Sequence, residues 1–279
     1  MTTTPVRTPV RTPAAPAAPS PARPFRLVRH SLALARRSLV KTWRTPEALV
    51  DVTLQPVLFL IIFVVIFGGA VAGSTHDYLQ FLLPGILAQT IAQGSISIGV
   101  NLNTDLDKGL FDRFRSLPIA RSAPLLGAVL GDVIRYVIVT VVTLVTGYAM
   151  GFRIGTDPLS VLAGAALAVL FALCLSWLSV FIGMKARTPG AVQGIMFLLI
   201  MPLTFASNVF VATDTLPGWM QSFVDVNPLT HLVGAVRGLF LGAVPGTSTA
   251  VEVWWTLGWS AALVAVFMPL ALRAYRRRV

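Results

Sequence analysis

Carboxylates that could hold a metal ion lie close together at one point of this 279-residue chain, at Asp105 and Asp107. Mg²⁺ prefers oxygen ligands, and a membrane enzyme acting on lipid diphosphates would use such a pair to hold the ion. No further acidic cluster accompanies the two residues. The sequence therefore favours a solvated loop here over a metal site.

Two other ionisable residues, Asp132 and Arg135, lie inside an apolar stretch. Three residues apart, they share one helix face and can neutralise each other. Ionisable residues within a membrane segment are rare, and they serve either as ion pairs or as steps of a proton relay. Since other acidic residues gather at the ends of apolar stretches, the pattern favours a structural ion pair.

Polar side chains recur every four residues through another apolar stretch, at Gln89, Gln93, Ser97 and Asn101. Such a stripe is poorly matched to lipid tails. It predicts either hydrogen bonds to a neighbouring helix or the lining of a substrate pathway.

Aromatic residues show the same spacing in the first apolar stretch, at Phe59, Phe63 and Phe67. Rings repeated every four residues lie on one face of a helix. That face could contact lipid, which the sequence favours, or line a route for greasy substrates.

Several kinds of chemistry find no support in the sequence. A phosphate-binding loop needs glycines before its lysine, a zinc protease needs H-E-x-x-H, and a disulfide needs two cysteines. None of these motifs includes the chain's candidate residues, which are Lys41, Lys108, Lys185, His30, His76, His231 and the single Cys174. We therefore expect no cofactor or metal in this chain, and ATP hydrolysis would have to come from another subunit.

The elements that must position these residues are six apolar stretches, each about 20 residues long and able to cross a bilayer. Apolar residues make up 55% of the chain, charged residues 12%, and the mean hydropathy is +0.77. The predicted fold is an all-α membrane protein of six transmembrane helices. The expected spans are 49–71, 79–101, 124–149, 159–183, 191–211 and 250–272.

Three regions follow from the same patterns. Residues 1–24, rich in Thr, Pro and Ala, read as a disordered cytosolic tail with no apolar core for a signal peptide. Residues 25–45 place apolar and basic side chains on opposite faces, which predicts an amphipathic helix on the membrane surface. Residues 46–279 form the six-span domain.

Basic residues indicate the orientation. Nineteen of the 22 Lys and Arg flank the spans on one side, whereas Arg153 and Arg237 lie on the other. The positive-inside rule places both termini in the cytosol. The net charge of +11 lies beside membrane segments, so it fits an anionic lipid leaflet better than a nucleic acid.

One outer connection, residues 212–249, is longer than the rest. It reads as two short helices, over 216–223 and 228–241, the second one after the turn signal Asn227-Pro228. An apolar stripe on the second predicts a re-entrant or surface element in the outer leaflet.

The loop 105–119 and the outer segment 227–239 resemble those of the type 2 ABC transporter permeases, most of all the daunorubicin-resistance-like drug efflux branch. The resemblance covers nearly everything after residue 25, including Gln55-Pro56 in the first span and Phe67-Gly68-Gly69 at its outer end.

The resemblance implies that the loop between the second and third spans is a coupling helix docking on a separate ATPase subunit, which binds ATP and Mg²⁺. Family members often have Glu where this chain has Asp112. The ATPase-coupling loop begins at Asp105 and Asp107, and the positions that match the family's motif are Gly109, Asp112, Arg113, Arg115, Leu117 and Pro118.

By the same resemblance, two copies of the chain would form a homodimer that carries two ATPase subunits in a bacterial plasma membrane. The expected function is the permease of an exporter of hydrophobic or amphipathic drugs or lipids, which is not itself an enzyme. Export of a polysaccharide or lipid-linked glycan is the alternative within this class. An integral-membrane lipid-modifying enzyme is the alternative from a different class.

Overall fold

Helices make up every regular element that the computed structural model describes, which covers residues 46–109, 123–242 and 247–278. The expected tail 1–24 and the amphipathic helix 25–45 lie outside these ranges. The α-helices are α2 (Pro46–Ala72), α3 (Thr75–Gly94), α4 (Ile96–Asp107), α6 (Ala123–Gly131), α7 (Val133–Met150), α8 (Pro158–Lys185), α9 (Pro189–Phe205), α10 (Gly218–Val224), α11 (Pro228–Leu241) and α12 (Thr249–Arg278), with one 3₁₀ turn, η1 (Thr213–Thr215).

Three helix starts share one local signal, a capping side chain followed by proline. Asp157, Thr188 and Asn227 precede α8, α9 and α11, and each side-chain oxygen accepts a hydrogen bond from a backbone N–H of the first turn. Proline at the first helical position lacks an N–H that would be unpaired there anyway. These pairs fix where three of the helices begin.

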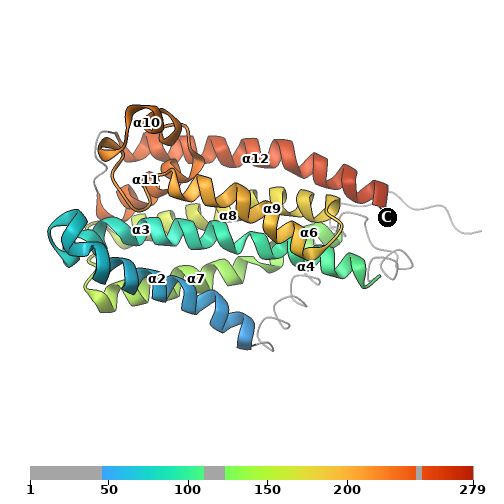
Figure 1. Ribbon diagram of the computed structural model, residues 1–279, viewed down its shortest axis with the longest axis horizontal. Helices are drawn as coiled ribbons and strands as arrows, with labels where there is room; N and C mark the ends of the chain where they lie inside the picture. The colour runs from blue at the N-terminus through green and yellow to red at the C-terminus, as the bar shows by residue number, and fades with distance from the viewer. Residues whose placement is uncertain (1–45, 110–122, 243–246, 279) are drawn as a thin grey trace, which may run out of the picture.

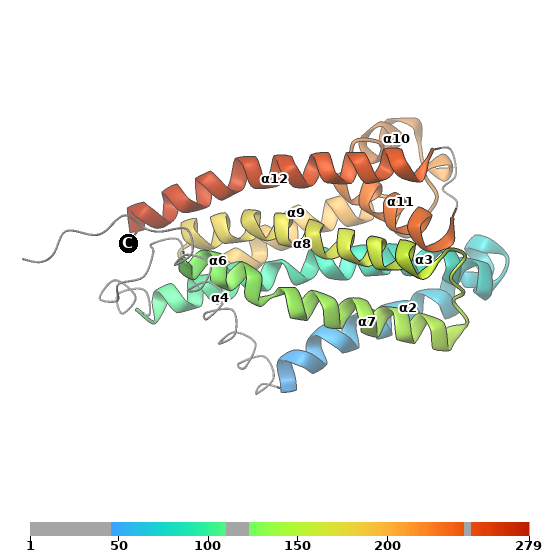
Figure 2. The same cartoon turned by 180° about the vertical axis from the view of Figure 1, so that it is seen from behind.

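The helices form an elongated bundle (Figure 1). α12 runs along one side and α2 crosses obliquely on the opposite side, with α3, α4, α8 and α9 between them. The short helices α10 and α11 lie at the end where α2 meets α3. The end of α4, the start of α6 and the C-terminal end of α12 lie at the other end, as the view from behind also shows (Figure 2).

Four helical segments are long and apolar enough to cross a membrane: Thr75–Asp107, Leu125–Met150, Pro158–Lys185 and Thr249–Arg278. They correspond to the predicted second, third, fourth and sixth spans. The predicted first and fifth spans coincide with shorter apolar segments, Thr53–Gly69 and Pro189–Phe205. The all-helical class is therefore confirmed, whereas the complete six-span topology stays a prediction.

The outer connection contains the two helices that the sequence predicts, α10 and α11. α11 is buried along nearly its whole length, because α3, α8, α9 and α12 all pack against it. A helix surrounded in this way lies inside the bundle. Its burial favours the re-entrant alternative over a surface element.

Close helix contacts depend on glycine at one crossing in particular. A Cβ added to Gly183 of α8 would lie 2.6 Å from the carbonyl oxygen of Gly99 of α4. The two backbones therefore approach more closely than any side chain would permit, as small residues at membrane helix interfaces allow.

Candidate functional site

The loop that the sequence links to an ATPase begins where α4 ends. Asp105 is half-buried, Asp107 is exposed, and Gly109 turns the chain with a φ of 65°. This left-handed conformation favours glycine. Within the described residues no group of three His, Cys, Asp or Glu could hold a metal ion. The remaining loop residues of the prediction lie outside the described residues: Asp112, Arg113, Arg115, Leu117 and Pro118.

Both spans that flank this loop are interrupted by a single residue. Ser95 separates α3 from α4, and Asp132 separates α6 from α7. At each interruption the backbone N–H donates to the carbonyl three residues earlier, Ala92 at 3.2 Å and Val129 at 3.3 Å. This is the tighter 3₁₀ pattern, which often marks a hinge within a longer helix.

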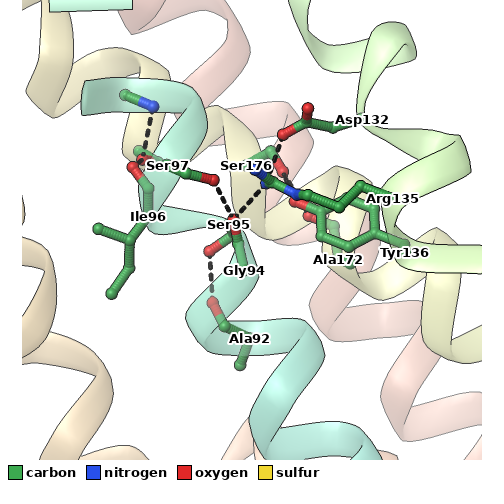
Figure 3. A network of polar contacts seen from close by, with 12 residues as sticks. Ala92, Gly94, Ser95, Ile96, Ser97, Asp132, Arg135, Tyr136, Ala172 and Ser176 are labelled. Atoms are coloured by element: carbon green, nitrogen blue, oxygen red, sulfur yellow. Dashed lines mark hydrogen bonds and ion pairs between the residues drawn. The ribbon is translucent and has the colours of Figure 1, made fainter. Parts of the chain in front are cut away.

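One side chain connects the two interruptions (Figure 3). Nη2 of Arg135 donates to the Gly94 carbonyl oxygen at 2.6 Å and to Oδ2 of Asp132 at 2.5 Å. The guanidinium thus lies at the C-terminal carbonyl end of α3, where a cation is favoured, and Asp132 balances its charge. We call Gly94, Asp132 and Arg135 the inner clamp.

The uninterrupted helix α8 contacts both spans just beyond their interruptions. The hydroxyls of Tyr136 and Ser176 form a hydrogen bond of 2.9 Å (Figure 3). On α4, the Ser179 hydroxyl donates to the Ile96 carbonyl at 3.1 Å and accepts from the Gly99 N–H at 3.1 Å. α8 therefore provides a common support for the two interrupted spans.

The polar stripe of the second span lies on both sides of the interruption at Ser95, with two of its residues on α3 and two on α4. Gln89 is 2% exposed, and its Oε1 has no hydrogen-bond partner among the described residues. Gln93 accepts a hydrogen bond from Nε2 of Gln55 on α2. Ser97 donates to the Gly94 carbonyl at 2.8 Å, and Asn101 is exposed. The four residues therefore have different surroundings instead of lining one continuous surface.

The predicted aromatic face on α2 extends onto the end of α9. Phe59 and Phe63 stack with centroids 5.8 Å apart, and Phe67 lies 5.3 Å from Phe63. Phe63 stacks at 4.7 Å on Phe210, which in turn stacks at 5.3 Å on Phe205. Phe59 and Phe63 are half-buried, so the row of five rings is a protein contact as well as an apolar surface.

A second buried arginine lies toward the other end of α3. Arg237 of α11 is 5% exposed, and its Nη2 donates to the carbonyls of Phe81 at 3.0 Å and Asn208 at 3.2 Å. Its guanidinium also lies 3.9 Å from the centroid of the Phe81 ring. The ion pairs found among the described residues do not include Arg237. We call Arg237 with these two carbonyls the outer anchor.

A histidine and a glutamate join α11 to α12 near the outer anchor. Nδ1 of His231 lies 2.8 Å from Oε2 of Glu252, and the imidazole stacks on the Trp255 ring at 5.0 Å. The Nε2 of His231 is buried with no partner within the described ranges. This pair connects α11 to α12.

The sequence did not reveal the outer anchor or the contacts of α8. Arg237 counted as an outer-loop charge, yet it is buried in the bundle; its apolar neighbours in a 14-residue helix were the available signal. Ser176, Ser179 and Gly183 form a row of small residues on one face of α8, which is a recognisable helix-packing signal. The single-residue interruptions each follow a glycine directly, Gly94 before Ser95 and Gly131 before Asp132, which was the available signal.

These features define the class of the protein: a multi-pass α-helical membrane protein whose polar groups lie at helix interruptions and helix contacts. The chain belongs to the ABC-2 type transporter family, whose sequence pattern matches residues 29–241. The match includes both segments on which the resemblance to type 2 ABC permeases was based.

Several relatives named as permeases match most of the chain. The daunorubicin resistance ABC transporter permease protein DrrB1 of Streptomyces coeruleorubidus is 41% identical over 92% of this chain and 90% of its own length. The probable doxorubicin resistance ABC transporter permease protein DrrC of Mycobacterium tuberculosis is 26% identical over 90% of this chain and 89% of its own. The putative transport permease ycf38 of Cyanophora paradoxa is 26% identical over 77% of this chain and 76% of its own.

Proposed function

We propose that this chain is the membrane subunit of an ATP-driven exporter that moves hydrophobic or amphipathic drugs, or lipids, out of a bacterial cell. The observation that carries the proposal is the 41% identity over 92% of the chain to a daunorubicin resistance permease. Because the relatives are named as permeases, the chain itself would be non-catalytic, and a separate ATPase would bind ATP and Mg²⁺.

The loop between α4 and α6 is the proposed ATPase contact. The described basic residues Lys108, Lys185 and Arg273 lie toward the same end of the bundle as this loop, together with Arg276–Arg278 at the end of α12 (Figure 2). By the positive-inside rule this end faces the cytosol, where an ATPase could reach Asp105, Asp107 and Gly109. Both termini would then be cytosolic.

A second copy of the chain completes the proposed translocator. α9 packs against the bundle through one row of buried residues, whereas most of its other side chains, Phe197 and Leu198 among them, are exposed. α12 likewise exposes Trp254 and Val266. Faces of this kind can contact lipid or a partner chain. A homodimer carrying two ATPase subunits is the simplest assembly that one permease sequence allows.

A substrate route is proposed between α2 and α9. Gln93 and Ser97 are half-buried in the second span, and Phe59 and Phe63 present an apolar wall on α2. Gln89 lies deeper on the same helix as Gln93. An apolar surface with a few amide and hydroxyl groups suits flat, amphipathic molecules, which require hydrophobic contact and few hydrogen bonds.

Reconstitution with its ATPase would test this function. Inside-out vesicles that contain both subunits should accumulate daunorubicin when ATP is added, and the variant Arg113→Glu/Arg115→Glu should abolish this uptake. Arg153→Glu is the matched control, because Arg153 is exposed at the opposite end of the bundle. Uptake that is independent of ATP, or unchanged in the loop variant, would refute the proposal.

A further inference from the structure

The inner clamp joins two interruptions that lie in the two spans leading into the same loop. α4 ends at Asp107 and α6 starts at Ala123 on either side of the loop, and their other ends meet Ser95 and Asp132. The i to i−3 bond is the same at both interruptions. Each span is therefore divided into a loop-side piece and an outer piece, with its weakest helical turn between them.

The pieces share α8 as a neighbour but differ in their other contacts. The outer pieces α3 and α7 pack against each other and against α2, while the loop-side piece α4 packs mainly against α8 and α9. α6 contacts α8 and α4. Movement of the loop-side pieces would therefore leave the α2–α3–α7 contacts intact, and α8 would be the support on which they turn.

The clamp joins the end of α3 to the start of α7 at the two interruptions. A single nitrogen, Nη2 of Arg135, makes the contacts to Gly94 and Asp132, so neither contact can change without affecting the other. Asp132 is itself the interrupting residue of its span, and Gly94 immediately precedes Ser95. One guanidinium thus fixes the distance between the two weak turns.

We propose that Arg135 and Asp132 are positioning residues for transport. The clamp ties the end of α3 to α7 where the two spans are interrupted, so that a push on the loop, carried by α4 and α6, reaches α3 and α7 together. This inference rests on the proposed function, because it assumes that a partner moves the loop. It extends the predicted structural ion pair to a role in coupling.

The test removes the clamp without leaving an unpaired buried charge. In Asp132→Asn/Arg135→Met both charges disappear together, so the chain should still fold. With the ATPase bound, ATP turnover should persist, while ATP-driven daunorubicin uptake should fall about tenfold or more, as expected for the loss of a coupling between two sites. The single variant Arg135→Lys should keep part of the uptake that the double variant loses, because one ammonium can donate to both acceptors.

A distance measurement tests the clamp independently of the proposed transport function. Spin labels at Asp107→Cys and the exposed Val141→Cys, in a Cys174→Ala background, report the position of α4 relative to α7, which the clamp joins to the start of α4. The labelled chain is diluted with unlabelled chain in nanodiscs without any ATPase. We expect one narrow distance distribution in the protein that keeps the clamp and a broad one in Asp132→Asn/Arg135→Met.

The outcomes are distinct. If the wild-type complex lacks ATP-driven uptake, the proposed function fails, but the label distances in the permease alone still decide the role of the clamp. If the double variant keeps the narrow distribution, or transports daunorubicin as well as the wild type, the clamp proposal is overturned. Arg153→Gln is the control, since this exposed arginine donates to the Tyr148 and Phe152 carbonyls of its own segment.

Discussion

The two arginines that bind toward opposite ends of α3, Arg237 buried and Arg135 partly buried, are held in different ways. Arg135 binds the Gly94 carbonyl and is paired with a carboxylate, Asp132. Arg237 binds the Phe81 and Asn208 carbonyls and lies against an aromatic ring, with no carboxylate partner among the described residues. Both attach a neighbouring helix to α3, but only Arg135 belongs to a charge-neutral pair.

The difference bears on what each arginine can do. A paired buried charge is sensitive to the loss of its partner, since the remaining charge is then desolvated without compensation. Arg237 donates to backbone carbonyls, which stay neutral when it is removed. The inner clamp therefore suits a position where two helices must move together, and the outer anchor suits a fixed attachment.

The largest expected effect separates the two sites directly. Arg135→Met should lower the free energy of unfolding by about 3–5 kcal/mol, because Asp132 is left as an unpaired buried carboxylate. SDS-induced unfolding in mixed micelles measures this loss. Adding Asp132→Asn to the same chain should restore most of the stability. If the single and double variants are equally unstable, the carboxylate is not the cause.

The sequence predicted much of the fold on which this comparison depends. The all-helical membrane class, the family, and the positions of α10 and α11 are confirmed, because apolar runs and pairs such as Asn227-Pro228 act locally. It also placed Asp132 and Arg135 on one helix face, and in the structure they form an ion pair. Their roles in transport remain a proposal.

Other features of the site depend on tertiary contacts that the sequence does not show. A glycine before Ser95 and before Asp132 marks a weak point in each helix, but nothing in the sequence shows that the two interruptions, which lie on either side of a loop, come together in the fold. Arg237 looked like an outer-loop cation because the counting rule considers sides of the membrane and not depth. Its burial results from α3, α8 and α12 packing around α11.

Two glycines of α3, Gly85 in its middle and Gly94 at its end, sharpen the comparison at the level of packing. A Cβ on Gly85 would lie 2.5 Å from the Val209 carbonyl oxygen, whereas a Cβ on Gly94 would lie 3.2 Å from Cε1 of the Tyr136 ring. Gly85→Ala should lower the unfolding free energy by about 1–3 kcal/mol, because a backbone atom must shift.

Gly94→Ala is the matched control at the inner end, since a ring can move more easily than a backbone. Its effect on the same SDS-induced unfolding should be below about 1 kcal/mol. Equal losses at Gly85 and Gly94 would mean that the middle of α3 is no more tightly packed than its end at the clamp.

Removing the other arginine should have a smaller effect than removing Arg135. Arg237→Met loses two hydrogen bonds to carbonyls but leaves no charge behind, so unfolding in SDS should become easier by only about 1–3 kcal/mol, which is about 0.5–1.5 kcal/mol for each bond. A loss as large as that of Arg135→Met would instead indicate a carboxylate partner for Arg237 outside the described residues.

The smallest effect is expected at an exposed carboxylate, which gives a lower limit for the comparison. Hydrogen bonds from the Ser160 hydroxyl and backbone N–H hold the pKa of Asp157, the cap of α8, below its ordinary value.

This contribution to stability should be complete above about pH 4, the ordinary range of an aspartate, and should be lost as the pH falls through the lowered pKa. Asp157→Asn, which keeps a good capping side chain, should therefore melt like the wild type at neutral pH and depend less on pH in acid. Melting temperatures of both proteins between pH 7 and pH 3 measure the difference. Identical acid profiles would show that the cap of α8 adds no charge-dependent stability.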